Sequence, residues 1–515
     1  MKQNLISTPP INKNLTKKED TKAFLWLLLY SFILLFFLSP DSYLYDLYYH
    51  IDSACFFMCG KAWMCGMVPY VDFADSKGPL LWLIYGLGYL ISHHSYIGVF
   101  WISILFYTAT LFTAYKLCRL FADKDVSAVS VAALPFFLFC FICHFEIRAE
   151  DFCYPFVMLS IYCTCHILKY RDSDTRTYFK LSALMGICSM CCVLIKYNIG
   201  CMIMGLMAVV LYMAIRHNAG WQSFWGMVIG FMVPAVPFVI CFLIQENLNA
   251  FIQEYFLNTF KTIENKNGTW LTRPHVVVKI GLMLVLLLSI YCFSRKHKLG
   301  YWLIPCFLLF IFGIGGYTYS YYYTIFSPFT IFFILLLFDF MMNKFPRLHE
   351  RKNGLCALFI IFSIVINYYG CYQIRFKFNE KSNMNYYKAA YIMSQINNPK
   401  VMYFPMSYGI GTPAGSLPAC KYWISQAGAT KEMRKEADDV LRSGVADFVL
   451  IYNPNEKKIK EIENYGYVFY CNAPMYDVKK TSSLFVFGRP GLRLPPEDFH
   501  VSQWDVWLKR NIFGI

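Results

Sequence analysis

Residues 50–81 read HIDSACFFMCGKAWMCGMVPYVDFADSKGPLL, and they come shortly after the apolar run 24–38. The stretch lies between two very hydrophobic regions, yet it holds five charged side chains: Asp52, Lys61, Asp72, Asp75 and Lys77. Charged groups beside a bilayer are costly unless they are solvated, paired or used in function. We therefore interpret this stretch as part of the first outer loop of a membrane protein, whose other segments hold it at the membrane surface.

The composition excludes an ordinary soluble protein. Of the 515 residues, 57% are apolar and only 15% are charged, and apolar runs recur between short polar links. Runs of about 17–25 apolar residues predict a polytopic helical membrane protein. The net charge of +15 could indicate nucleic-acid binding, but the basic residues lie in the short links. The positive-inside rule explains that placement, so we expect no nucleic-acid partner.

The apolar runs divide the chain into a cytoplasmic tail (1–22), a transmembrane region (23–371) and a C-terminal domain (372–515). We expect the first outer loop to cover residues 40–95. Residues 79–91 are too short to span, and they predict an amphipathic helix in the membrane interface. The eleven predicted spans are about 24–39, 96–117, 126–145, 152–168, 181–195, 199–215, 224–245, 276–294, 301–315, 324–342 and 354–369.

With these spans, every strongly basic link falls on one side, which places the N-terminus in the cytoplasm and the C-terminus outside. The C-terminal region lacks spanning runs. Short strands alternate there with helical stretches such as 429–443, which predicts a small extracytoplasmic α/β domain. The predicted strands are 401–404, 448–452, 467–471 and 484–488.

The 20 cysteines lie mostly within apolar runs, where a thiol behaves as a small hydrophobe. Their spacing does not match a zinc site, and we expect no metal and no cofactor. The sequence also has no phosphate-binding Gly-rich loop and no ATPase motif. The energy for a reaction must then come from an activated substrate, and a donor already in the membrane would fit.

The first outer loop holds the strongest catalytic candidate, Asp52. A carboxylate just beyond a helix end can act as a general base on an acceptor hydroxyl or amine, although a solvated loop residue or a helix cap would look the same. In the motif DFADSK, Lys77 lies at headgroup depth, where an ammonium suits a lipid phosphate. It could instead snorkel from the interface. Asp72 and Asp75 share this motif, and Asp75 could position Lys77 or bind a sugar hydroxyl.

Other candidates lie in outer turns. The turn EIRAED (146–151) contains Arg148, Glu150 and Asp151, and its excess of acid over base leaves room for a sugar or phosphate beside mutual salt bridges. Lys196 lies at the tip of an apolar hairpin, on the side where positive charge is disfavoured, which favours a functional role. Tyr321 and Tyr322 belong to a tyrosine run that could line a substrate pocket or form an aromatic belt.

Together these residues resemble the GT-C superfamily of polytopic glycosyltransferases that use lipid-phosphate sugars. The likeness is to bacterial members related to protein O-mannosyltransferases and to the aminoarabinose transferase of lipid A. It rests on Asp52, on GMVPYVDFADSKGPLLW (66–82), on the acidic turn, on Lys196 and on the tyrosines before Pro328. It covers about residues 24–370, while the C-terminal region matches only loosely.

The resemblance implies transfer, with inversion, from a polyprenyl-phosphate sugar. Asp52 would match the catalytic acidic residue of the first loop, and Lys77 would match the lysine near the lipid phosphate. Two departures concern substrate choice: Ser53 follows Asp52 where some relatives have a second acid, and Lys77-Gly78-Pro79 replaces the usual Lys-Pro-Pro.

The leading hypothesis is a glycosyltransferase of the bacterial cytoplasmic (inner) membrane. Its partners would be membrane lipids, a polyprenyl-phosphate sugar donor, and a glycan, lipid or protein acceptor. Arg148 and Lys196 would be secondary charge partners, and Tyr321 and Tyr322 would shape the site. One alternative is a transporter or flippase, but such proteins place charges near the membrane midplane. A second is a lipid-linked glycan polymerase or ligase, which usually depends on a large late outer loop rich in Arg and His.

Overall fold

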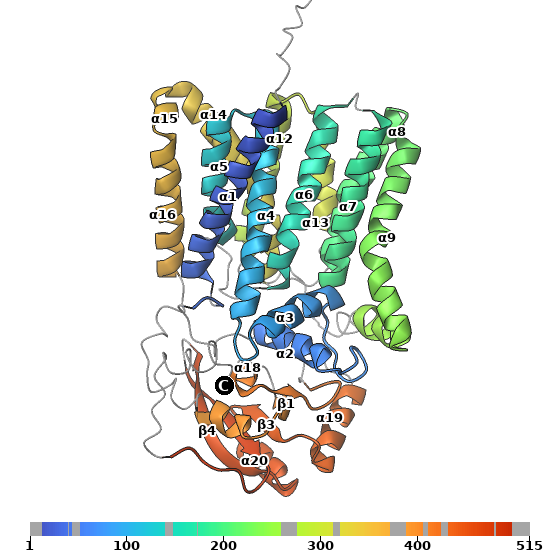
Figure 1. Cartoon of the computed structure of the whole chain (residues 1–515), viewed down its shortest axis with the longest axis vertical. Coiled ribbons are helices and arrows are strands. Elements are labelled where there is room, and N and C mark those ends of the chain that lie inside the picture. Colours follow the sequence, from blue (N-terminus) through green and yellow to red (C-terminus); the bar gives the residue numbers. More distant parts are fainter. Residues whose placement is uncertain are drawn as a thin grey trace, which may run out of the picture.

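The computed structural model describes residues 13–39, 41–43, 52–139, 148–171, 174–258, 276–312, 320–370, 388–404, 410–423, 431–477 and 480–496. Figure 1 shows three levels along the long axis of the molecule: a bundle of long helices, two short helices that lie across one end of it, and an α/β unit beyond them. We call the end of the bundle next to the short helices the site end, and the opposite end the basic end.

Each apolar run that we predicted to span contains a helix of the bundle. Among the described residues, seven helices are long and apolar enough to cross a membrane, so the protein is a multi-pass membrane protein. The total of eleven spans stays a prediction. The bundle elements are α1 (Lys13–Leu38), α4 (Ile97–Phe121), α5 (Lys124–Phe139), α6 (Ala149–Lys169), α7 (Thr175–Ile195), α8 (Tyr197–Arg216), α9 (Gly220–Ile244), α12 (Val276–Lys296), α13 (Leu303–Phe312), the 3₁₀-helix η4 (Ser320–Phe329), α14 (Thr330–Lys344), α15 (Arg347–Glu350) and α16 (Lys352–Gly370).

Two short helices, α2 (Asp52–Met64) and α3 (Pro79–Ile91), cross the site end of the bundle (Figure 1). The bounds of α3 agree with the predicted 79–91. The interpretation of 50–81 as a loop was wrong for α2, which is buried from Ser53 to Ala62 and so lacks an amphipathic pattern. The two helices approach closely at Gly60, where a Cβ would lie 2.5 Å from the backbone nitrogen of Gly86.

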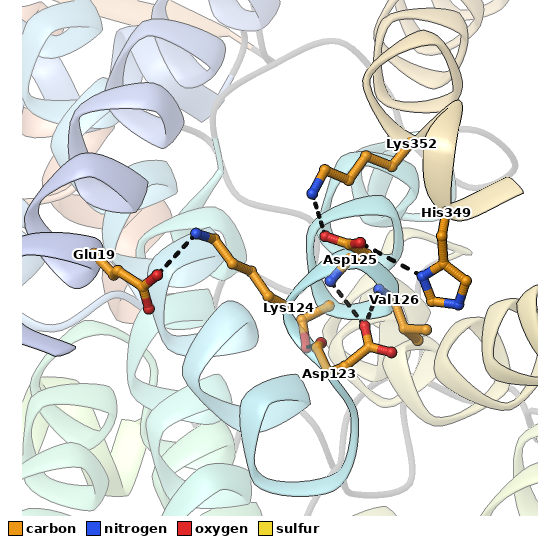
Figure 2. A network of polar contacts seen from close by, with 8 residues as sticks. Glu19, Asp123, Lys124, Asp125, Val126, His349 and Lys352 are labelled. Atoms are coloured by element: carbon orange, nitrogen blue, oxygen red, sulfur yellow. Dashed lines mark hydrogen bonds and ion pairs between the residues drawn. The ribbon is translucent and has the colours of Figure 1, made fainter. Parts of the chain in front are cut away.

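The basic end is tied together by ion pairs between neighbouring helices (Figure 2). Lys124 of α5 binds Glu19 of α1 at 3.0 Å. On the next residue, Asp125 pairs with Lys352 of α16, and its second oxygen lies 3.5 Å from Nδ1 of His349. Because these groups are partly exposed, each pair contributes only about 0–1 kcal/mol to stability. More important for the topology is that the basic links between the helices lie together at this end of the bundle.

The α/β unit contains a five-stranded sheet with the strand order β2-β1-β3-β5-β4. Strand β1 pairs in parallel with β2 and β3, whereas β5 pairs antiparallel with β3 and β4. The four predicted strands are present, and the two-residue β2 was missed because it is too short to give a pattern. The elements are β1 (Lys400–Phe404), α18 (Gly411–Ala414), β2 (Leu417–Pro418), α19 (Lys431–Ser443), β3 (Phe448–Tyr452), α20 (Glu456–Asn464), β4 (Val468–Asp477) and β5 (Lys480–Gly488).

The α/β unit docks on α2 and on the turn between α3 and α4. Tyr96 and Thr412 share a buried hydrogen bond of 2.7 Å between their hydroxyls. Lys61 of α2 donates to the backbone carbonyl of Gly415, and its ammonium also lies 5.7 Å from the ring centre of Tyr89. Lys61 is only 3% exposed. A charged group therefore lies inside the interface between α2 and the α/β unit.

Lys61 makes the stability of this interface depend on pH. Burial lowers the pKa of Lys61 to about 8, below its ordinary value of 10.5. Between these two values the unfolded chain binds more protons than the folded protein, so stability rises with pH over this window and falls as pH drops toward 8. Between pH 8 and pH 10.5, the free energy of unfolding of the wild type should increase by on the order of 2 kcal/mol relative to that of Lys61→Met. Thermal unfolding of both proteins across this range measures the difference, and a constant difference would contradict the assignment.

Candidate functional site

Asp52 begins α2 at the site end of the bundle, and its carboxylate is half-buried. The first turn of a helix carries partial positive charge, which favours a carboxylate there. The charged groups that act on Asp52 are Lys77, Arg148, Glu150 and Asp75, in order of decreasing effect. Burial raises the pKa of Asp52 above its ordinary value of 3.8, and the attraction of Lys77 and then Arg148 offsets part of that rise. The structure thus gathers five of the predicted site residues.

Lys77 is held at the end of the irregular segment between α2 and α3. Its ammonium lies 5.6 Å from the ring centre of Phe56, and it donates to Oγ of Ser76 at 3.2 Å. The hydroxyl of Ser76 contacts Asp75 at 3.4 Å. Lys77 is also the strongest attracting charge on Asp52, and an ammonium in this position suits a phosphate, the anion expected at a membrane surface.

The backbone next to Lys77 fits directly against α7. The N–H of Gly78 donates to the carbonyl of Ile195 at 3.0 Å, and a Cβ on Gly78 would lie 2.1 Å from the carbonyl oxygen of Leu194. A proline at position 78 would lack this N–H and add ring atoms where a Cβ alone does not fit. This close approach explains why the chain has Lys-Gly-Pro where the resemblance led us to expect Lys-Pro-Pro.

Tyr70 is a site-supporting residue that the sequence analysis missed. Its φ of 64° is rare for a bulky residue, and such strain persists only where the surroundings enforce it. The ring is fully buried, with its centre 4.6 Å from that of Trp82, and its hydroxyl donates to the carbonyl of Lys77 at 3.1 Å. Tyr70 therefore fixes the backbone from which Lys77 extends. No sequence pattern marks it, because its role depends on backbone geometry.

The start of α6 and the residue between α7 and α8 add a buried group of charges. Glu150, at the start of α6, forms an ion pair with Lys196, the single residue between α7 and α8. Glu150 is 3% exposed and Lys196 is 7% exposed, and Arg148 nearby is also buried. With Asp52, Asp75 and Lys77, the site brings together three carboxylates and three cations. Such a balanced set can bind a substrate that carries both hydroxyls and a phosphate.

Asp151 and Asp72 have local structural roles. Asp151 caps α6: one oxygen accepts the N–H of Arg148 at 2.7 Å, and the other accepts the hydroxyl of Tyr107 at 3.0 Å. Asp72 accepts the N–H of Val68 at 2.7 Å and so closes the turn that follows α2. Both were predicted to bind substrate, which stays a prediction, while the contacts found here stabilise the backbone.

Tyr321 and Tyr322, which were predicted to shape the site, belong to the 3₁₀-helix η4. This element packs against α6, whose first turn carries Glu150. The side chains of both tyrosines lie outside the described part of the structure, so their role in shaping the site stays a prediction.

Known proteins resemble this chain in fold and in part of its sequence. Residues 76–243 match the family of dolichyl-phosphate-mannose-protein mannosyltransferases, a range that includes Lys77, Glu150 and Lys196. The crystal structure of ArnT from Cupriavidus metallidurans in the apo state is similar in fold, with a TM-score of 0.60, 11% identity, and 92% of this chain and 98% of that chain covered. The structure of the same protein bound to undecaprenyl phosphate gives a TM-score of 0.60, 10% identity, and coverage of 91% and 98%. No curated protein matches the chain by sequence.

Proposed function

We propose that the chain is a member of the GT-C superfamily of glycosyltransferases and that it transfers a sugar from a polyprenyl-phosphate donor to a glycan, lipid or protein acceptor. The family match over residues 76–243 and the fold shared with ArnT support this proposal. One observation carries the proposal: a half-buried carboxylate, Asp52, lies in the field of Lys77 and Arg148 at one end of a membrane-spanning bundle. A lipid-linked donor can enter the bilayer side of such a site with its phosphate at headgroup depth. The undecaprenyl phosphate bound to ArnT supports a donor of this class.

The proposed reaction is a single displacement. Asp52 takes the proton from the acceptor hydroxyl or amine while that atom attacks the anomeric carbon of the sugar. The bond between the anomeric carbon and the phosphate oxygen breaks, and the oxygen leaves with the electron pair as polyprenyl phosphate. The developing charge on the phosphate is stabilised by Lys77, with Arg148 contributing at longer range. Lys196 acts through Glu150, whose charge it balances.

The proposal assigns no resident cofactor. The donor carries its own leaving group, and the cations of the site can neutralise the departing phosphate. We also propose the bacterial cytoplasmic membrane as the location, with the site end and the α/β unit outside. The gathering of the basic links at the opposite end supports this orientation.

Reconstituted sugar transfer tests the proposed function. Liposomes that contain the purified protein and a labelled polyprenyl-phosphate sugar are mixed with a cell-envelope acceptor fraction. We expect the label to move to the acceptor and unlabelled polyprenyl phosphate to appear in equal amount. A nucleotide sugar in place of the lipid donor should give no transfer. Movement of the labelled lipid across the bilayer without transfer would contradict the proposal and favour a flippase.

A further inference from the structure

The loop after α9 connects the α/β unit to the candidate site. It contains α10 (Leu248–Phe251) and a seven-residue π-helix, η2 (Ile252–Asn258). Short π-helical segments are rare and occur frequently at functional sites. On η2, Glu254 is 8% exposed, and the ammonium of Lys421 from the α/β unit lies 2.5 Å from its Oε1.

Glu254 binds more than one partner. The hydroxyl of Tyr422 donates to the same Oε1 at 2.9 Å, and the side-chain amide of Asn258 donates to Oε2 at 2.9 Å. A carboxylate is costly to bury, and this set of donors satisfies both of its oxygens and its charge. We call Glu254, Lys421 and Tyr422 the clamp.

The backbone of the clamp reaches the Lys77 segment. The carbonyl of Lys421 accepts the N–H of Ala74 at 2.9 Å, three residues before Lys77. The N–H of Lys421 donates in turn to Glu436 of α19 at 3.2 Å, which anchors the residue in the α/β unit. One residue of the α/β unit therefore holds both a charge on η2 and a backbone group of the segment that carries Lys77.

Two other residues of the loop after α9, Tyr255 and Asn247, make hydrogen bonds at or beside this segment. The hydroxyl of Tyr255 donates to the carbonyl of Val193 at 2.6 Å, close to the end of α7 on which Gly78 docks. The side-chain amide of Asn247 donates to the carbonyl of Pro69 at 2.8 Å. The loop after α9 and the α/β unit thus both contact the segment 69–78. The Glu254–Lys421 ion pair joins that loop to the α/β unit.

We propose that Lys421 is a positioning residue: by pairing with Glu254 it holds its carbonyl against Ala74, and so it fixes Lys77 where the donor phosphate binds. The inference rests on the proposed function, because Lys77 is assigned to a polyprenyl phosphate there. The α/β unit would then contribute to donor binding through Lys421, a residue far in sequence from the site.

Undecaprenyl phosphate is the probe for the test. In the purified full-length protein, Lys421→Met should weaken binding of this lipid by about tenfold, since small displacements of a binding group have large effects. Lys421→Arg keeps the charge and should bind within about twofold of the wild type. Lys435→Met, which removes an exposed lysine of α19, is the matched control and should bind normally.

Hydrogen exchange of the peptide that contains Ala74 separates the clamp from the donor assignment. Loss of the Lys421 contact should speed exchange of this peptide in Lys421→Met but not in Lys421→Arg. Glu254→Gln should fall between them, because it keeps hydrogen bonding and loses the charge. Wild-type exchange and wild-type lipid affinity in Lys421→Met would overturn the inference. If the wild type itself did not bind undecaprenyl phosphate, the donor assignment and the role of Lys421 in donor binding would both fail, while exchange would still show whether the contact exists.

Discussion

Asp52→Asn should lower kcat for sugar transfer by about 10²–10⁴-fold, the range that a positioned general base contributes. The substitution keeps the size of the side chain and its place at the start of α2, but an amide cannot take the proton of the acceptor. Affinity for undecaprenyl phosphate should stay close to that of the wild type, because Lys77 is assigned to the phosphate. Transfer and lipid binding are measured on the same preparation.

The raised pKa of Asp52 adds a pH signature to this prediction. Transfer by the wild type should rise with pH as Asp52 loses its proton, at an apparent pKa above 3.8. A carboxyl whose folded pKa is raised stabilises the fold most below its unfolded pKa, and this contribution is lost as pH rises through the folded pKa. Asp52→Asn should therefore unfold at a higher temperature than the wild type at neutral pH.

Asp72→Asn is the matched control, since the side chain of Asp72 accepts the N–H of Val68 and closes a turn. It should keep transfer within a few-fold of the wild type. Full transfer by Asp52→Asn would contradict the assignment of the base and leave Asp75 and Glu150 as the remaining carboxylates of the site.

Lys196→Met should destabilise the protein by about 3–5 kcal/mol, the cost of removing one partner of a buried ion pair. Glu150 would then lack the cation that balances it, in a position that is 3% exposed. The double variant Glu150→Gln/Lys196→Met removes both charges and should recover much of the loss. Thermal unfolding of the purified variants in one detergent measures both effects.

Lys352→Met tests the contrast with a partly exposed pair. It breaks the Asp125–Lys352 contact at the basic end (Figure 2), where we expect a change of about 0–1 kcal/mol. If Lys196→Met and Lys352→Met lowered stability equally, Glu150 and Lys196 would not form the buried pair described here.

Much of the fold follows from the sequence because spanning helices leave a strong signal. The uninterrupted apolar runs gave the bundle helices, and Pro79 together with the polar SHHS after Ile91 gave the bounds of α3. The signal failed for α2, because a helix packed on most sides between two layers has no polar face. It also failed for η2, since a seven-residue π-helix has no sequence pattern of its own.

The candidate site was predictable to the extent that topology alone assembles it. Asp52, Arg148 and Lys196 each lie at a helix end on the same side of the bundle, so correct helix directions bring them together. The capping role of Asp151 left no sequence signature, because a capping box is recognised by Ser or Thr at the N-cap and α6 has Arg148 there. The clamp could not have been predicted from the sequence. Glu254 and Tyr422 are 168 residues apart, and only the packing of the α/β unit brings them together.

The measurement that tests the central claim most directly is photo-crosslinking with undecaprenyl phosphate that carries a photoreactive group beside its phosphate. The label should map by mass spectrometry to peptides that contain Lys77 and Lys196, and an excess of unmodified undecaprenyl phosphate should abolish it. Labelling confined to peptides of the basic end, such as those with Lys124 or Lys352, or labelling that the competitor leaves unchanged, would contradict a donor site at Asp52 and Lys77.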